Sequence, residues 1–109
     1  MRMWKVPTQC LCRKHLLGEH VEMHMLVGSI LGGKSIKGFL EKGLVEVHNI
    51  STRHQELAEE MAKRGMKHKS ELKSFPVYQA GTVNVQSNLE ELKSRCPKCK
   101  SLIDGEKDA

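Results

Sequence analysis

A fourteen-residue stretch, CRKHLLGEHVEMHM at 12–25, holds three histidines and two glutamates. On a helix, His15, Glu19 and Glu22 fall at positions i, i+4 and i+7 and therefore share one stripe. An imidazole and two carboxylates on one face can transfer protons and stabilise a positive charge. The alternative is an ordinary solvated helix face that carries a His–Glu pair.

His20 and His24 lie at i and i+4 and could hold a metal ion on another face of the same helix. The pattern is not that of a helical zinc protease. In that motif a glutamate follows the first histidine directly, whereas Glu22 lies two residues after His20. The sequence offers no obvious third ligand, so a metal-dependent hydrolase is the weakest of the hypotheses.

The four cysteines form two close pairs at opposite ends of the chain. Cys96-Pro-Lys-Cys99 has the spacing of a zinc knuckle, and Cys10-Leu-Cys12 opens the first predicted helix. Together they could close a structural zinc site that joins the two ends. His68 could replace Cys10, because on a regular helix the side chains of Cys10 and Cys12 point about 200° apart. The alternative is a set of buried, inert thiols.

The elements that must position these residues are predicted to be helices, which makes the fold class all-α. Hydrophobic periodicity and helix-ending glycines set most boundaries, and Ser87 begins a capping-box pattern for the last helix. The predicted order begins with an irregular arm at 1–7, a helix at 9–31 capped by Thr8, and a basic connector at 34–43 that could hold a short helix. A helix at 44–64, a mostly irregular stretch at 66–86 in which residues 82–85 could be extended, and a short helix at 88–95 follow. We expect a single-domain helical bundle over 1–103, with a cysteine-containing C-terminal segment and a disordered tail at 104–109.

The chain has 109 residues and a net charge of +5, and its basic excess is uneven. Residues 1–69 hold 12 Lys and Arg against 7 Asp and Glu, whereas residues 70–109 hold 6 of each kind. Positive charge concentrated in one part of a protein favours a polyanion such as nucleic acid. No segment approaches the roughly 20 apolar residues that span a bilayer. The first residues do not form a signal peptide, so we expect a cytoplasmic protein without membrane contact.

Two blocks of sequence, HLLGEHVE at 15–22 and AEEMAKRG at 58–65, resemble the pyrimidine-dimer DNA glycosylases of the phage endonuclease V type. The resemblance covers roughly residues 1–72. It implies a small, all-helical enzyme that needs no cofactor and uses its N-terminal α-amine as the nucleophile. The amine attacks C1′ of a damaged nucleotide, an imine forms, and β-elimination nicks the strand. The matching positions here are Met1 for the nucleophile, Glu22 for the catalytic glutamate, His15 for the histidine and Arg2 for the following arginine.

Elementary chemistry fits these implied roles. An imine requires an unprotonated amine, and α-amines titrate near pH 7.7 whereas lysines titrate near 10.4. A chain terminus is therefore a ready nucleophile at neutral pH. A carboxylate such as that of Glu22 would stabilise the positive iminium. We expect Met1 to be retained, because removal of the initiator generally requires a small second residue and Arg2 is large.

The sequence also departs from the family pattern. Val21 and Met25 stand where the phage enzyme has arginines beside its catalytic glutamate, which leaves open whether the lesion is a pyrimidine dimer, another lesion or an abasic site. Other basic residues could contact the phosphates of damaged double-stranded DNA. The predicted DNA-binding residues are Arg2, Arg13, Lys14, His20, His24, Lys34, Lys37 and Lys42.

Two functional hypotheses lead. The first is a monomeric DNA-repair glycosylase with AP-lyase activity, which acts through Met1 and Glu22 without a catalytic cofactor. The second is a non-catalytic basic module that binds nucleic acid and is stabilised by a structural zinc ion.

Overall fold

The chain folds into helices joined by irregular segments in a computed structural model, which describes residues 1–67 and 71–105. No β-strand occurs within these two ranges, so the predicted all-α class is confirmed. None of the helices in them is both long enough and apolar enough to cross a membrane. The α-helices are α1 (Arg13–Leu31), α2 (Lys37–Glu41), α3 (Ile50–Lys63), α4 (Val85–Arg95) and α5 (Pro97–Asp104), with 3₁₀ turns at Thr8–Cys10 and Val47–Asn49.

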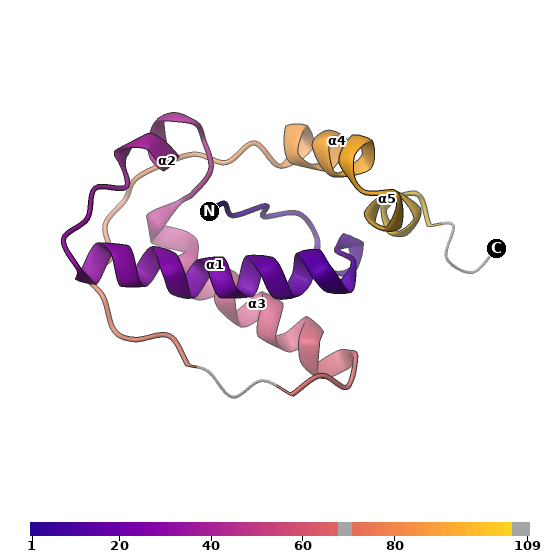
Figure 1. Cartoon of the computed structure of the whole chain (residues 1–109), viewed down its shortest axis with the longest axis horizontal. Helices are drawn as coiled ribbons and strands as arrows, with labels where there is room; N and C mark the ends of the chain where they lie inside the picture. The colour runs from indigo at the N-terminus through magenta and orange to yellow at the C-terminus, as the bar shows by residue number, and fades with distance from the viewer. Residues whose placement is uncertain (68–70, 106–109) are drawn as a thin grey trace.

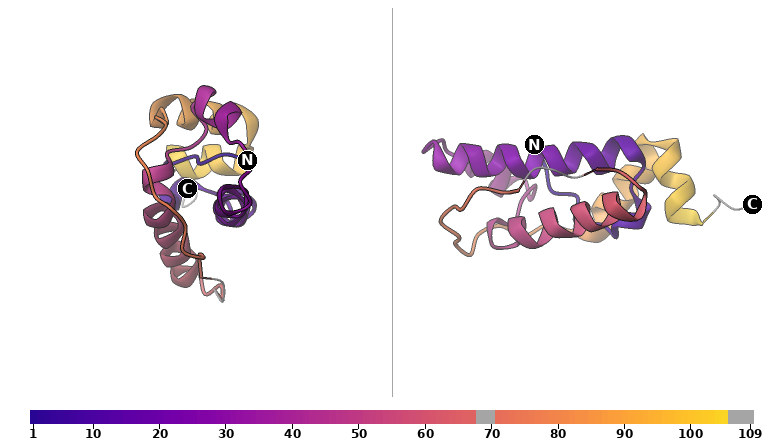
Figure 2. Two further views of the ribbon diagram at one scale, coloured as in Figure 1. Left: turned by 90° about the vertical axis from the view of Figure 1, so that its left-hand side faces the viewer. Right: turned by 90° about the horizontal axis from the view of Figure 1, so that it is seen from below.

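The N-terminal arm lies between two layers of helices. Figure 1 shows it alongside α1, with α2 and α4 on its other side and α3 crossing beneath α1. The views in Figure 2 agree with this arrangement. The arm is not a loose extension, because Met3 and Val6 are fully buried and the backbone N–H of Met3 donates to the carbonyl of Leu44 at 2.6 Å.

The first long helix starts four residues later than predicted. Thr8 does not cap it, since Thr8–Cys10 form a separate 3₁₀ turn and the extended residue Cys12 precedes the helix. Arg64 accounts for the interruption, because its Nη2 donates to the carbonyls of Thr8 at 3.2 Å and Leu11 at 2.7 Å. The bend buries Leu11 completely. It also places the side chain of Cys12 at the start of α1.

The second predicted helix was also too long at its start. Residues 44–49 are a bend and a 3₁₀ turn, and α3 begins at Ile50. The buried carboxylate of Glu46 organises this bend by accepting from Lys5 Nζ at 2.7 Å, Asn49 Nδ2 at 2.6 Å and the Val83 backbone N–H at 2.7 Å. Burial raises the pKa of Glu46, but these hydrogen bonds outweigh it and the net pKa is lowered. Tertiary hydrogen bonds thus replace the first helical turns.

The C-terminal part contains more helix than predicted. α4 starts at Val85, and its cap is Asn84, whose side chain accepts from the Ser87 backbone N–H at 2.9 Å. The CPKC motif, predicted only as a knuckle, begins α5, with Cys96 as the cap and Pro97 in the first turn. α5 continues to Asp104, the first residue of the tail predicted at 104–109, and residues 106–109 lie outside the described part of the chain.

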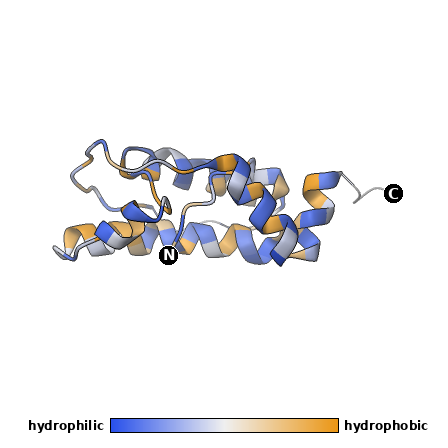
Figure 3. Cartoon of the chain, turned by 90° about the horizontal axis from the view of Figure 1, so that it is seen from above, coloured by the Kyte–Doolittle hydropathy of each residue, from blue (hydrophilic) through white to orange (hydrophobic). Residues whose placement is uncertain are grey.

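The buried face of α1 mixes polar and apolar side chains. Figure 3 shows hydrophobic and hydrophilic residues interspersed along it. Its buried residues combine apolar side chains with two polar ones; they are Leu16, Glu19, His20, Met23, Leu26 and Val27. A helix that buries polar side chains must provide them with hydrogen-bond partners. The two polar residues are Glu19, which contacts the arm and α3, and His20, which packs beside His54 of α3.

Candidate functional site

A pocket opens where the start of the chain meets α1. Its volume is about 400 Å³. The lining residues come from the arm, α1, the 44–49 bend and α4: Met1, Arg2, Trp4, Lys14, His15, Gly18, Glu19, Glu22, Leu44 and Arg95. The structure therefore gathers Met1, Arg2, His15 and Glu22, all predicted site residues, around one cavity.

Glu22 is held against the first peptide unit of the chain. The backbone N–H of Arg2 donates to Glu22 Oε1 at 2.5 Å. Met1 is the preceding residue, so this carboxylate lies one residue from the α-amine. A negative charge at this position can attract a cationic amine and can stabilise an iminium formed on it.

Glu19 has a different environment, although it shares a helix stripe with Glu22. It is 1% exposed and forms a two-pronged ion pair with Arg53 of α3, with Nε–Oε2 at 2.6 Å and Nη2–Oε1 at 2.9 Å. Its Oε2 also accepts from the backbone N–H groups of Trp4 at 3.1 Å and Lys5 at 3.4 Å. Lys5 has a positive φ of 58° at this bend. Glu19 thus joins the arm to α1 and α3.

Replacing Arg53 by methionine is expected to destabilise the fold by about 3–5 kcal/mol, because the buried Glu19 carboxylate would lose its charged partner. Denaturant unfolding followed by far-UV circular dichroism measures the change. The matched control is Arg13→Met on the exposed start of α1, which should shift the free energy of unfolding by no more than about 0.5 kcal/mol. Equal stabilities for the two variants would contradict the structural role of the Glu19–Arg53 pair.

The Arg2 side chain is held by α4 through two residues that the sequence did not indicate. Its Nη1 donates to Glu91 Oε2 at 2.9 Å and its Nη2 to Asn88 Oδ1 at 2.7 Å. The hydrogen bond from Arg2 is the main reason why the pKa of Glu91 is lowered. The guanidinium also lies over the Trp4 ring, 3.9 Å from its centre, and Asn88 Nδ2 donates to the Trp4 carbonyl at 2.7 Å. α4 therefore fixes the direction of the arm.

His15 joins the pocket to a cluster of cysteines. Its Nδ1 lies 3.2 Å from Cys12 Sγ and 3.4 Å from Cys99 Sγ, and Cys12 Sγ lies 3.9 Å from Cys96 Sγ. Potential ligand atoms of these four residues all lie within 4.8 Å of one another. The sequence predicted Cys10 as the fourth ligand, but this group does not include it. His68, the predicted substitute, lies outside the described residues.

Burial and charge act on the protonation of this cluster. The pKa of His15 is lowered by burial and by the neighbouring cations Lys14 and Arg95, which outweigh the opposite effect of Glu22. Burial raises the pKa of the Cys99 thiol to about 12. A lowered pKa favours the neutral imidazole of His15, which can act as a ligand or as a hydrogen-bonding group.

A second histidine group lies between α1 and α3. His54 Nε2 is 3.1 Å from His24 Nε2, and the ring centres of His20 and His54 are 4.7 Å apart. Potential ligand atoms of the three residues lie within 4.8 Å of one another. His54 therefore supplies the third imidazole for which the sequence gave no indication, since it lies 30 residues beyond His24.

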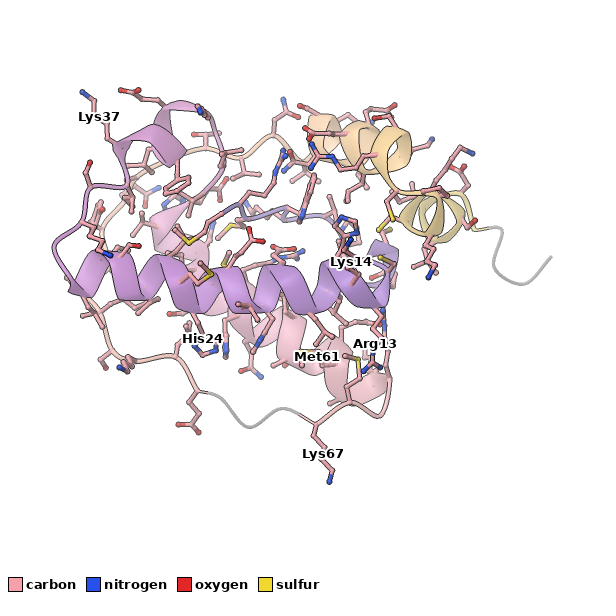
Figure 4. The ribbon with its side chains drawn as sticks, viewed as in Figure 1. Arg13, Lys14, His24, Lys37, Met61 and Lys67 are labelled. Atoms are coloured by element: carbon pink, nitrogen blue, oxygen red, sulfur yellow. The ribbon has the colours of Figure 1, made fainter. Side chains whose placement is uncertain are left out.

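The predicted DNA-binding residues are spread over the molecule. Lys14 lines the pocket, whereas His20 is 7% exposed and packed beside His54. In Figure 4, Lys14 lies on the side of α1 that faces the arm, whereas His24 and Arg13 lie on its other side. Lys37 lies at the outer edge of α2. The exposed cations in this set are Arg13, Lys14, Lys34, Lys37 and Lys42. Of the predicted set, Arg2 and Lys14 line the pocket itself.

Comparison with known proteins gives one family match. The model of a family described as pyrimidine dimer DNA glycosylase matches residues 1–74, which include α1, α2 and α3. No curated protein and no solved structure shows a significant match. α4 and α5, which hold Arg2 and contribute two of the clustered cysteines, lie beyond the matched residues.

Proposed function

The chain belongs to the pyrimidine dimer DNA glycosylase family, and on that premise we propose that it removes a damaged pyrimidine from duplex DNA and then nicks the strand. The observation that carries this proposal is the 2.5 Å hydrogen bond from the Arg2 backbone to Glu22. It brings a carboxylate to the first peptide unit, at the wall of a pocket that Met1 also lines. A nucleophilic amine and a stabilising carboxylate are the two groups that an imine mechanism requires.

The proposed reaction begins at the α-amine of Met1. Its nitrogen lone pair attacks C1′, the glycosidic bond breaks with its electron pair going to the base, and the departing base takes up a proton. The amine then loses a proton as the C1′–O4′ bond opens, and the sugar oxygen is protonated. The product is an iminium between Met1 and the opened sugar. Loss of a C2′ proton expels the 3′ phosphate by β-elimination, and water finally releases the amine.

Glu22 and His15 are proposed to support different steps. Glu22 stabilises the positive iminium and can accept or return the protons that move in ring opening and elimination. Nδ1 of His15 lies against the sulfurs of Cys12 and Cys99, so Nε2 is the ring nitrogen that would contact the nucleotide. A base inside a duplex is out of reach, so a nucleotide must leave the stack to enter the pocket.

Phosphate contacts are proposed to supply most of the affinity before chemistry. Lys14 beside the pocket and the exposed Arg13, Lys34, Lys37 and Lys42 are the candidates for these contacts. Each phosphate contact releases a counterion from the DNA, so the affinity should fall as the salt concentration rises. This role of the basic residues does not require contact with the bases, so lesion choice would depend on how readily the DNA deforms.

Reductive trapping tests the mechanism. Untagged protein is mixed with borohydride and a duplex that carries a cyclobutane pyrimidine dimer, a duplex with an abasic site, or an undamaged duplex. We expect a stable covalent adduct with the dimer duplex, which peptide mapping assigns to Met1. A metal-dependent hydrolase would form no such adduct.

The other outcomes separate the alternatives. An adduct with the abasic duplex alone would restrict the activity to a lyase. Binding without any adduct would contradict the enzymatic proposal and favour a non-catalytic module that binds DNA. An adduct at a lysine would retain the imine chemistry but reject Met1 as the nucleophile.

A further inference from the structure

The cluster of Cys12, His15, Cys96 and Cys99 has the composition and geometry of a zinc site. We propose that these four residues bind one structural zinc ion through three sulfurs and His15 Nδ1. Two short pairs supply the ligands, Cys12-x-x-His15 and Cys96-x-x-Cys99. Cys₃His is one of the common ligand sets of structural zinc in proteins.

The observed distances agree with tetrahedral coordination. With Zn–S near 2.3 Å and Zn–N near 2.0–2.1 Å, a tetrahedron requires roughly 3.8 Å between two sulfurs and roughly 3.6 Å between sulfur and nitrogen. The structure has 3.9 Å between the sulfurs of Cys12 and Cys96. It has 3.2 and 3.4 Å from His15 Nδ1 to the sulfurs of Cys12 and Cys99. Small movements would therefore place all four atoms around one ion.

Backbone groups hold the ligand sulfurs in place. The backbone N–H of Cys12 donates to Cys99 Sγ at 3.2 Å, and that of Cys99 donates to Cys96 Sγ at 3.4 Å. Hydrogen bonds of this kind orient metal ligands and stabilise the negative charge of thiolates. Each pair also begins a helix, since Cys12 precedes α1 and Cys96 precedes α5. The helices thus fix the direction of both pairs.

A disulfide is the main alternative for these thiols. A disulfide would join two of the three sulfurs. It would not account for the close approach of the third sulfur and of His15 Nδ1 to the same point. The separation of 3.9 Å between Cys12 and Cys96 is far from the S–S bond length of about 2.05 Å. The group of His20, His24 and His54 is a second metal candidate, but it lacks the thiolates that favour zinc.

The zinc ion would connect the family-matched part of the chain to the segment beyond it. Cys12 and His15 belong to the matched residues 1–74, whereas Cys96 and Cys99 do not. α4, which is next to α5, holds Arg2 through Asn88 and Glu91. Zinc would therefore keep in position the helix that directs the arm toward Glu22. The effect on catalysis rests on the proposed function, whereas zinc binding itself does not.

The test measures zinc directly in the full chain with a native N-terminus. Protein produced with zinc and passed through gel filtration is analysed by inductively coupled plasma mass spectrometry, and we expect one zinc per chain. Cobalt substituted for zinc should give thiolate charge-transfer absorption and the visible bands of a tetrahedral site. These readouts do not depend on DNA or on activity.

Matched variants assign the ligands. Cys99→Ser and Cys96→Ser should lose most of the metal, and Cys96 is the safer variant because it is only partly buried. Cys10→Ser and His24→Gln should retain one zinc, since neither residue belongs to the cluster. A folded wild-type protein without zinc, or an intact mass lower by two hydrogens than the reduced chain, would overturn the proposal. Retention by Cys96→Ser with loss in His24→Gln would move the metal to the histidine group.

Hydrogen exchange follows the structural consequence. Removing zinc with a chelator under reducing conditions should increase amide exchange in α4 and α5 by at least about tenfold, because the ion would no longer hold them to α1. Exchange in the middle of α3 should change much less. Unchanged exchange in α4 and α5 after complete zinc removal would contradict a structural role. Failure of the glycosylase assay alone would leave this result unaffected.

Discussion

Glu22→Gln is expected to lower strand nicking by about 10²–10³-fold, the usual effect of removing one electrostatic group from a reacting centre. Glutamine is nearly the same size and keeps an oxygen that can accept the Arg2 backbone N–H. The variant therefore removes the negative charge with little change in the arm. Affinity for a dimer duplex should stay within about threefold, because phosphate contacts supply most of the binding.

Single-turnover nicking and a binding titration on the same duplex measure the two effects. Glu41→Gln is the matched control, since Glu41 is an exposed glutamate on α2 outside the pocket lining. Its nicking rate should equal that of the wild type. If Glu22→Gln nicks as fast as the wild type, the carboxylate has no catalytic role. If its folding is lost, the charge serves the structure instead, and thermal unfolding distinguishes that case.

Blocking the α-amine should abolish both nicking and borohydride trapping. A Gly-Ser extension before Met1 converts the amine into an amide, which has no basic lone pair for attack on C1′. The extension would also have to pass through the pocket that Met1 lines. We therefore expect no adduct and no nicking above the uncatalysed level, with affinity for undamaged DNA retained.

A removable extension provides the control for this experiment. A fusion whose protease leaves Met1 as the first residue should regain the full nicking rate after cleavage. Activity of the uncleaved fusion would reject the α-amine as the nucleophile. Lys14 would then be the next candidate, because it is a primary amine that lines the same pocket. Trapping with Lys14→Arg, which keeps the charge but removes the amine, would decide between the two.

The two glutamates of one helix stripe show what a periodic pattern can determine. The spacing of Glu19 and Glu22 predicted one shared stripe of α1, and in the structure the backbone of the arm donates to both carboxylates. It could not predict that Glu19 is buried against Arg53 while Glu22 lies at the pocket. Arg53 is 34 residues away from Glu19 in the chain, and no local pattern specifies which distant cation will pack against it.

The helix boundaries also separate what local sequence predicts from what tertiary contacts decide. Glycines after α1 and α3 correctly predicted where these helices end, because their backbones favour the turns that follow helices. The starts were wrong, since Arg64 and Glu46 supply tertiary hydrogen bonds that replace the first helical turns. The starts of α1 and α3 therefore depend on partners that are distant in the chain.

The sequence by itself determined the all-α class, the family, and the helix that carries His15 and Glu22, because these depend on local spacing and on short motifs. Only the tertiary structure decided that His15 joins Cys12, Cys96 and Cys99, and that α4 directs Arg2. Apart from the local contact between Cys12 and His15, these contacts join residues more than 80 positions apart. The sequence shows which side chains could take part in the site, but the packing of α4 and α5 against the start of the chain determines which of them come into contact.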